Sequence, residues 1–321
     1  MRTLRGSGAA IHNTNNDGGD RTAVTAFADQ HTVAPAAASA AQWSAGQTTY
    51  HLGGARLGVV VPVLGAHGQA GTSGMALALA DAAAGVGLRV LLVDCADPAR
   101  SGLAGVAGIE GRSVRVAQDK AQIRMAIRAL PRGRVATRRL VGDGTPLQVS
   151  AVPLPLSWAA TVLDEIDITV VDVGWDVWHL MAPSRPIGPL AWCGGPSAAT
   201  FPVMVLRPAA GSVVLAEGVL TRYASATSLL GLAHLLAVVA VGAEAWPPPA
   251  QAVMGLYLQQ AGERVHFVPA TAQAAVGGWG TASAPAASIR TATAVLQTIG
   301  GGIAAAVGQL PARRGRRRTQ P

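Results

Sequence analysis

The sequence predicts an α/β protein in which helices cover a doubly wound, mostly parallel β-sheet. Three observations lead to this fold class. Apolar segments of strand length recur along the chain, and segments of helical length separate several of them. A glycine-rich turn joins the first of these strands to the first helix. The strands are apolar throughout rather than alternating, which is typical of strands buried on both faces of a parallel sheet.

The first elements follow one another closely. Residues 57–64 (LGVVVPVL) predict a buried strand, and residues 65–71 predict a glycine-rich turn. Residues 73–86 are rich in Ala and Leu and predict a helix that glycines end, and residues 88–94 (LRVLLVD) predict a second buried strand. A strand–helix–strand connection joins parallel strands of one sheet, so the two strands are expected to run parallel with a right-handed crossover.

Later apolar segments continue the pattern. Strands are expected at residues 168–173, 202–207, 235–241 and 264–268, and helices at residues 212–226, 250–261 and 286–307. The longest apolar run, residues 229–243, is shorter than the roughly 20 residues of a membrane span. It is better explained as the end of a helix that leads into a buried strand.

The two ends of the chain differ from the middle. Residues 1–55 are rich in Ala, Ser, Thr, Asn and Gly without a sustained period, and predict a disordered arm. Residues 56–310 form the predicted α/β domain, and residues 311–321 an Arg-rich, disordered tail. The absence of an apolar signal segment and the presence of only two cysteines favour a cytoplasmic protein. A peripheral position at the nucleoid or a membrane stays open.

Positive charge is concentrated in one internal segment. The chain has a net charge of +8 and a single lysine, and residues 112–139 hold nine basic residues and one acidic residue. Lys120, Arg124 and Arg128 recur every four residues, which predicts a basic stripe on a helix. With Arg138 and Arg139 they are candidates for contacting DNA or another acidic partner. The alternative is a solvated amphipathic helix.

The glycine-rich turn is the main candidate site. A loop between a buried strand and a helix presents backbone N–H groups to an anion, and the helix N-terminus adds positive potential. Residues 65–73 read GAHGQAGTS, which partly fits the phosphate-loop pattern G-x-x-x-x-G-K-[ST]. Thr72 stands where that pattern has its lysine.

Three segments together resemble the ParA/MinD family of P-loop ATPases. They are the loop 67–73 (HGQAGTS), the segment 90–98 (VLLVDCADP), which is similar to the family's strand and D-x-D-P motif, and the strand 168–172 (ITVVD), which is similar to its Walker B strand. The resemblance covers most of residues 57–300. It implies a P-loop NTPase-like fold that binds ATP or ADP with Mg²⁺.

The resemblance also implies roles for individual residues. Asp94 is the candidate that would orient the attacking water, and Ser73 and Asp172 are the candidate Mg²⁺ ligands. The nucleotide-binding candidates that the resemblance supplies are Gly65, His67, Gly68, Gly71, Thr72, Ser73, Asp97 and Asp172. A partner protein, a homodimer and a part in plasmid maintenance, partition or conjugative transfer are the expected context.

The chain departs from the family at both lysines. His67 stands at the signature lysine and Thr72 at the Walker lysine, and the acidic motif has one extra residue. Without the ammonium group, much of the charge stabilisation of phosphoryl transfer is lost. A pseudo-ATPase or weak nucleotide binder is therefore expected, and binding of no nucleotide at all also stays open. The alternative is an active ATPase with a substituted cation.

A second nucleotide fold also fits part of the pattern. Gly65, Gly68 and Gly71 form a G-x-x-G-x-x-G run, and Asp94 follows Gly71 at about the spacing of a ribose-binding acid. This loop resembles that of extended short-chain dehydrogenases, which need a tyrosine followed four residues later by a lysine for proton transfer. No tyrosine of this chain has such a lysine, because the one lysine is Lys120. Dehydrogenase chemistry of that type is therefore excluded, and a non-catalytic dinucleotide-binding regulator remains the alternative.

Overall fold

The computed structural model describes residues 51–52, 55–106, 111–116, 121–142, 144–182, 188–194, 200–270 and 283–300. Most of the predicted arm and the whole Arg-rich tail lie outside the described residues. Where the arm meets the domain, β1 (His51–Leu52) and β2 (Ala55–Arg56) form a two-stranded antiparallel ribbon.

One nine-stranded sheet organises the domain, with the order β11-β10-β9-β3-β8-β4-β7-β6-β5. Its strands are β3 (Val59–Gly65), β4 (Val90–Asp94), β5 (Arg112–Arg115), β6 (Gln122–Leu130), β7 (Gly133–Val141), β8 (Ile168–Asp172), β9 (Val203–Leu206), β10 (Ala237–Val241) and β11 (Val265–Val268). Neighbours from β11 to β7 pair in parallel, and β7, β6 and β5 pair antiparallel. The predicted mostly parallel α/β sheet is confirmed.

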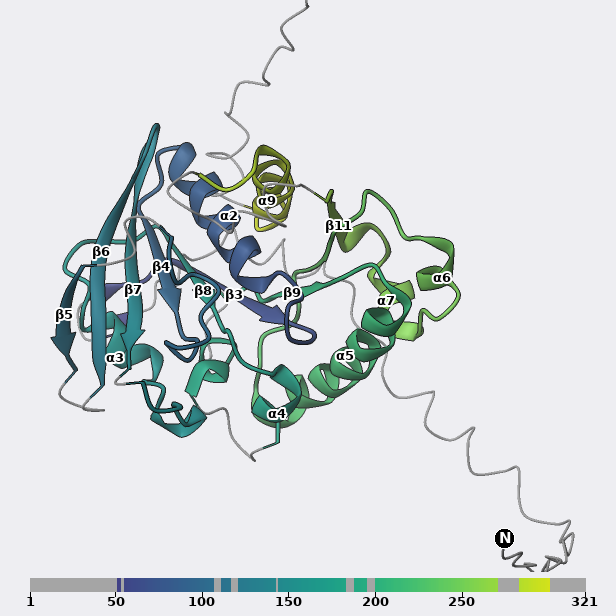
Figure 1. The fold of residues 1–321 in the computed structure, drawn as a ribbon, viewed down its shortest axis with the longest axis horizontal. Helices are drawn as coiled ribbons and strands as arrows, with labels where there is room; N and C mark the ends of the chain where they lie inside the picture. The colour runs from purple at the N-terminus through teal and green to yellow at the C-terminus, as the bar shows by residue number, and fades with distance from the viewer. Residues whose placement is uncertain are drawn as a thin grey trace, which may run out of the picture. The chain divides into compact units, whose positions relative to one another are not determined.

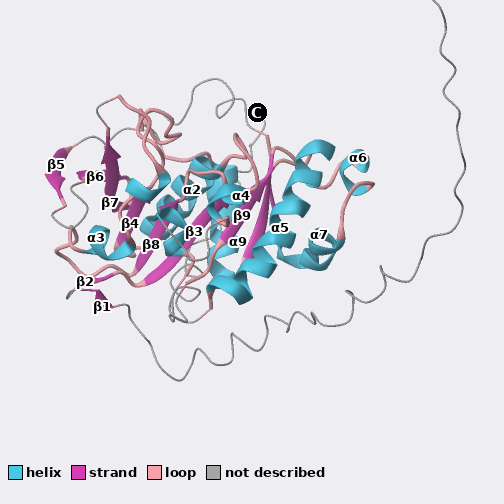
Figure 2. Cartoon of the chain, turned by 90° about the horizontal axis from the view of Figure 1, so that it is seen from below, coloured by secondary structure: helices cyan, strands magenta, loops and turns pink. Residues whose placement is uncertain are grey.

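Helices cover both faces of the sheet (Figures 1 and 2). On one face α2 (Thr72–Gly85) packs beside α9 (Ala286–Thr298). The other helices among the described residues are α3 (Pro155–Ala159), α4 (Val177–Leu180), α5 (Ala210–Leu230), α6 (Pro248–Gln251) and α7 (Leu256–Ala261). Short 3₁₀ turns occur at Val149–Ala151, Gly188–Trp192 and Gly262–Arg264. No helix in the described part of the chain is long and apolar enough to cross a membrane.

The apolar strands are explained by this two-sided cover. Val61 and Val63 of β3 belong to the core cluster that includes α2 and α9, whereas Val60 and Leu64 belong to the cluster that includes α5. Successive strand side chains point to opposite faces, so a strand covered on both sides must be apolar at every position.

Several element boundaries differ from the predictions. The helix expected at 212–226 is longer in the structure, where α5 spans Ala210–Leu230 and leads toward β10 as expected. The helix expected at 250–261 is wrong as a single element, because an extended Gly255 separates α6 from α7. The helix expected at 286–307 ends at Thr298, and its last predicted residues lie outside the described part.

The predicted basic helix is wrong. Residues 122–130 form strand β6, which pairs antiparallel with β7, and Lys120 lies outside the described residues. A spacing of four residues fits one helical turn and also two repeats of a strand, so Arg124 and Arg128 share a face in either structure. The β6–β7 hairpin and β5 extend the parallel sheet with three strands that the sequence analysis did not expect.

The strand order places the glycine-rich turn at the centre of the sheet. Strand β3 lies between β8 and β9, and the connection from β3 runs to β4 on one side whereas the connection from its neighbour β9 runs to β10 on the other side. Ligands of open α/β sheets bind at such a point, at the carboxyl ends of the strands. The turn after β3 and the residues that end β4, β8 and β9 therefore meet at one edge.

Candidate functional site at the carboxyl edge of the sheet

The loop after β3 folds as a tight turn onto the N-terminus of α2. Gly71, the residue before the helix, has φ +102°, and a β-carbon there would lie 3.3 Å from the Val241 side chain. Both the conformation and the close approach require glycine. Thr72 begins the helix and its hydroxyl packs against Gly65. The predicted strand–loop–helix arrangement is present, with an uncharged residue at its head.

The loop is tied to β9 and α5 by a polar network. His67 Nδ1 lies 2.7 Å from the Gly68 carbonyl oxygen, which can only accept, so this nitrogen carries the hydrogen. His67 Nε2 lies 2.6 Å from Ser212 Oγ, which also accepts from the backbone N–H of Arg207 at 3.0 Å. His67 is therefore partly buried, and its ring is bonded to α5 rather than turned toward solvent.

Two aspartates end neighbouring strands side by side. Asp94 of β4 and Asp172 of β8 are paired in register, and both are fully buried. Burial raises the pKa of Asp94, although its hydrogen bonds and Arg139 act in the opposite direction. The two acidic segments that resemble family motifs thus end next to each other at one edge of the sheet.

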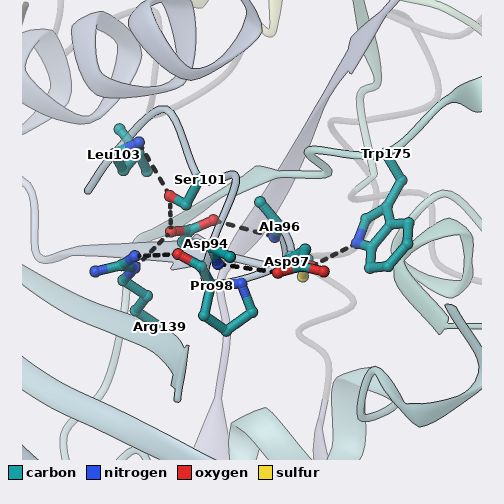
Figure 3. A network of polar contacts seen from close by, with 10 residues as sticks. Asp94, Ala96, Asp97, Pro98, Ser101, Leu103, Arg139 and Trp175 are labelled. Atoms are coloured by element: carbon teal, nitrogen blue, oxygen red, sulfur yellow. Dashed lines mark hydrogen bonds and ion pairs between the residues drawn. The ribbon is translucent and has the colours of Figure 1, made fainter. Parts of the chain in front are cut away.

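Asp94 is held by groups of its own chain (Figure 3). Its carboxylate accepts from Ser101 Oγ at 2.5 Å and from the Ala96 N–H at 3.1 Å, and Arg139 Nε lies 3.2 Å away as an ion-pair partner. Arg139 also donates to the Pro98 carbonyl at 2.9 Å. These contacts leave Asp94 little capacity to orient a water molecule.

Asp172 has the opposite environment. Neither carboxylate oxygen has a hydrogen bond of ordinary geometry among the described residues. Polar contact with Ser73 and with the Gly174 N–H lowers the pKa of Asp172, but less than burial and Asp94 raise it. Burial first, and then the charge of Asp94, raise the pKa of Asp172 to about 7. An orphaned buried carboxylate beside the Ser73 hydroxyl fits the oxygen ligands that Mg²⁺ prefers.

A short segment covers the head of α2 next to Ser73. A β-carbon added at Gly102 would lie 2.5 Å from Ser73 Oγ, so the segment has no room for a side chain there. Leu103 is fully buried, and its N–H donates to Ser101 Oγ at 3.0 Å. Ser101 thus joins this cover to Asp94, and a divalent ion at Ser73 would have to share the space with Gly102.

Asp97 serves a turn. Its carboxylate accepts from the N–H groups of Ala99 and Leu147, both at 2.9 Å, which holds the two loops together. A hollow of about 190 Å³ lies beside it, lined also by Pro98 and Gly142 among others. Both carboxylate oxygens of Asp97 are therefore engaged by its own loop and by the chain that follows β7.

The basic candidates do not form a common surface. Arg128 is buried and bridges to Asp81 of α2, and Arg139 is buried against Asp94. Arg138 is also buried and donates to Thr161, while Arg124 is half-buried on β6. Of the five candidates for contacting an acidic partner, Arg128 of the predicted stripe and the two further candidates Arg138 and Arg139 are thus buried, and each neutralises or satisfies a group inside the fold.

Two residues that were not predicted from the sequence, Arg207 and Ser212, meet the loop from the other side. Arg207 directly follows β9, and its Nε donates to the Gln69 carbonyl at 3.0 Å. The available signal was its place at the end of a predicted strand, where ligand-binding residues of such sheets gather. Nothing in the sequence alone tells that β9 lies beside β3.

No family model and no curated protein sequence matches this chain. Among solved structures, it is similar to the MinC:MinD cell division protein complex of Aquifex aeolicus, with 18% identity and a TM-score of 0.47 over 74% of this chain and 95% of that chain. It is also similar to the septum site-determining protein MinD of Pyrococcus horikoshii, complexed with Mg-ADP, with 13% identity and a TM-score of 0.45 over 74% of this chain and 95% of that chain. A third similar structure is the cell division ATPase MinD of Pyrococcus furiosus, with 14% identity and a TM-score of 0.43 over 79% of this chain and 100% of that chain.

Proposed function

We propose that this protein is a nucleotide-binding protein of the ParA/MinD type that does not turn over ATP and acts through partners. The observation that carries the proposal is the state of Asp94, whose carboxylate is already bonded to Ser101, Ala96 and Arg139. The uncharged Thr72 at the N-terminus of α2 supports it, because the lysine that would stabilise the transferred phosphoryl group from this position is missing. Loop amides, the Ser73 hydroxyl and Asp172 are the groups that would hold the nucleotide and Mg²⁺.

The direct test is a titration with fluorescent ADP and ATP analogues, with and without Mg²⁺, beside an assay for phosphate release. Saturable binding without release is the expected result. Mg²⁺-dependent turnover would replace this proposal with the active ATPase, and absence of binding would remove the nucleotide function. A parallel titration with NAD(H) tests the dinucleotide-binding regulator, which a signal for NAD(H) alone would favour.

Restoring the missing charge is expected to strengthen binding. In Thr72→Lys the new ammonium can make a charge-assisted hydrogen bond to phosphate, which is worth roughly 1.5–3 kcal/mol, or about 10- to 100-fold in Kd for ADP. Thr72→Met is the matched control, because it adds a long side chain without charge. Equal affinities for the Lys and Met variants would show that the lost lysine is not what limits binding.

The role of this protein in plasmid maintenance, partition or conjugative transfer is part of the proposal and rests on the sequence resemblance alone. A partner protein, a homodimer and a peripheral position at the nucleoid or a membrane belong to the same proposal. Co-purification of a tagged full-length chain from its host tests for the partner protein, and light scattering with and without nucleotide tests for the dimer.

DNA is the second proposed partner. Its proposed binding surface is the antiparallel extension, by which we mean strands β5, β6 and β7. Arg112, Arg115, Arg132 and Arg134 are exposed there, and no acidic residue occurs among the described positions of 111–142. We expect Arg112→Gln/Arg115→Gln to weaken duplex DNA binding and to reduce its salt dependence, because each lost phosphate contact lowers the slope by about one.

A gel-shift titration at two salt concentrations measures this effect. The control is Arg264→Gln/Arg290→Gln, which removes the same charge from positions outside the extension. If both double variants bind equally, the weakening reflects net charge and the extension is not the binding surface.

A further inference from the structure

We infer that Arg207 is the cation of the phosphate site. It supplies, from the end of β9, the positive charge that is missing at the N-terminus of α2, where Thr72 stands. This inference rests on the proposed nucleotide function and adds the residue that recognises the phosphate groups. Arg207 comes immediately after β9, the strand that pairs with β3 through Gly65. The arginine and the loop therefore leave adjacent strands at the same edge of the sheet.

Arg207 is attached to the loop at two points. Its Nε donates to the Gln69 carbonyl at 3.0 Å, and its backbone N–H donates to Ser212 Oγ, which bonds His67. A hydrogen bond at Nε fixes the plane of the guanidinium group. The terminal nitrogens have no partner among the residues that the structure describes, and the side chain is exposed. With Nε engaged, the edge formed by Nη1 and Nη2 faces no described partner, and two parallel N–H groups of this kind are suited to bidentate bonding of a phosphate.

The loop conformation supports this arrangement. Gln69 has φ +64°, a left-handed conformation that residues other than glycine rarely adopt, and no other described non-glycine residue has a positive φ. It is the carbonyl of this residue that receives the Arg207 hydrogen bond. Unusual backbone at a loop between a strand and a helix is found where ligands are held.

Two other basic side chains near this edge, Arg139 and His67, are already used. Arg139 is bound to Asp94 and to the Pro98 carbonyl, and the His67 ring is engaged at both nitrogens. Asp172, buried beside Ser73 and without a hydrogen bond of ordinary geometry among the described residues, marks the cation-binding side of the same loop. Arg207 on one side and Asp172 on the other would thus hold a phosphate group and its divalent ion across the loop.

The test compares the wild-type chain with Arg207→Gln, Arg207→Lys and Arg264→Gln, using fluorescent ADP and fluorescent adenosine as probes. Arg264 is the matched control, because its described bond is also to a backbone carbonyl, that of Gln260, but it precedes β11 and so lies at the opposite edge of the sheet. Arg207→Gln is expected to bind ADP about tenfold or more weakly, and Arg207→Lys to fall between it and wild type, because lysine keeps the charge but not the fork. Adenosine binding is expected to be unchanged.

The outcomes separate the two claims. If wild type binds ADP and Arg207→Gln binds it equally well, the inference about Arg207 is wrong while the nucleotide function stands. If Arg207→Gln weakens adenosine as much as ADP, the residue supports the loop and does not recognise phosphate, which also overturns the inference. If wild type binds no nucleotide, both fail. A thermal melt of each variant confirms that the fold is intact, as expected for an exposed side chain.

Discussion

Replacing Arg128 by methionine is expected to lower the free energy of unfolding by about 3–5 kcal/mol. Arg128 of β6 and Asp81 of α2 form an ion pair in which both side chains are almost completely buried. Asp81 also accepts from the Ala284 N–H at 2.8 Å, so it joins α2, the β6–β7 hairpin and the chain before α9. Without the guanidinium, the Asp81 carboxylate is buried without its cation, which is the costly part of breaking such a pair.

Urea unfolding at neutral pH measures this loss, and Asp81→Asn/Arg128→Met is the matched control. The neutral asparagine oxygen can still accept from the Ala284 N–H, so the double variant is expected to recover much of the stability lost by the single variant. Burial raises the pKa of Asp81 even with Arg128 present. The deficit of the single variant should therefore shrink as the pH falls and Asp81 gains a proton. A single and a double variant of equal stability would mean that lost packing, and not the uncompensated charge, explains the effect.

Replacing Asp172 by asparagine is expected to stabilise the protein above neutral pH. The pKa of Asp172 is raised to about 7 in the folded state, against 3.8 for the unperturbed group. A carboxyl group whose pKa is higher in the folded than in the unfolded state does not lower the stability at pH values below the unfolded-state pKa. It lowers the stability most at pH values above the folded-state pKa. The wild-type chain should therefore lose stability as the pH rises from about 4 to about 7, by an amount on the order of 4 kcal/mol. Asparagine removes this loss because it carries no charge beside Asp94.

Urea unfolding between pH 5 and about pH 8 in buffer with EDTA measures the effect, where the gain should grow with pH over this range. Glu244→Gln is the control, because Glu244 is exposed and removal of its charge should leave the pH profile unchanged. A gain of the same size at every pH would point to a packing effect of asparagine. Added Mg²⁺ should stabilise the wild type and not Asp172→Asn if the carboxylate binds the ion, since ligands that bind only the folded state add to its stability.

Much of the fold could be predicted because its signals are local. Strands buried on both faces are apolar at each position, so the segments that became β3, β4, β8, β9, β10 and β11 were found from the sequence. The turn at 65–71 was found from its glycines, and Gly71 is needed for a left-handed conformation. Asp94 and Asp172 were both candidates, and the structure brings them together because β4 and β8 are neighbouring parallel strands that end at one edge.

The antiparallel extension could not be predicted in the same way. Arg124 and Arg128 recur at a spacing that fits a helix and a strand, so the pattern alone does not choose between them. The choice depends on β7, which pairs with β6 along its whole length. Burial of Arg128 likewise depends on Asp81, an acidic residue of a helix far away in the sequence.

By itself, the sequence determined the parallel sheet, the loop before α2 and the absence of a lysine at position 72, because each of these features can be recognised from a short continuous segment of the chain. Only the tertiary structure decided which charged groups remain free to act. Asp94 is occupied by Ser101 and Arg139, while Arg207 reaches the loop through Gln69. These pairings join residues that are distant along the chain, and they exist because packing sets the order of the strands that carry them.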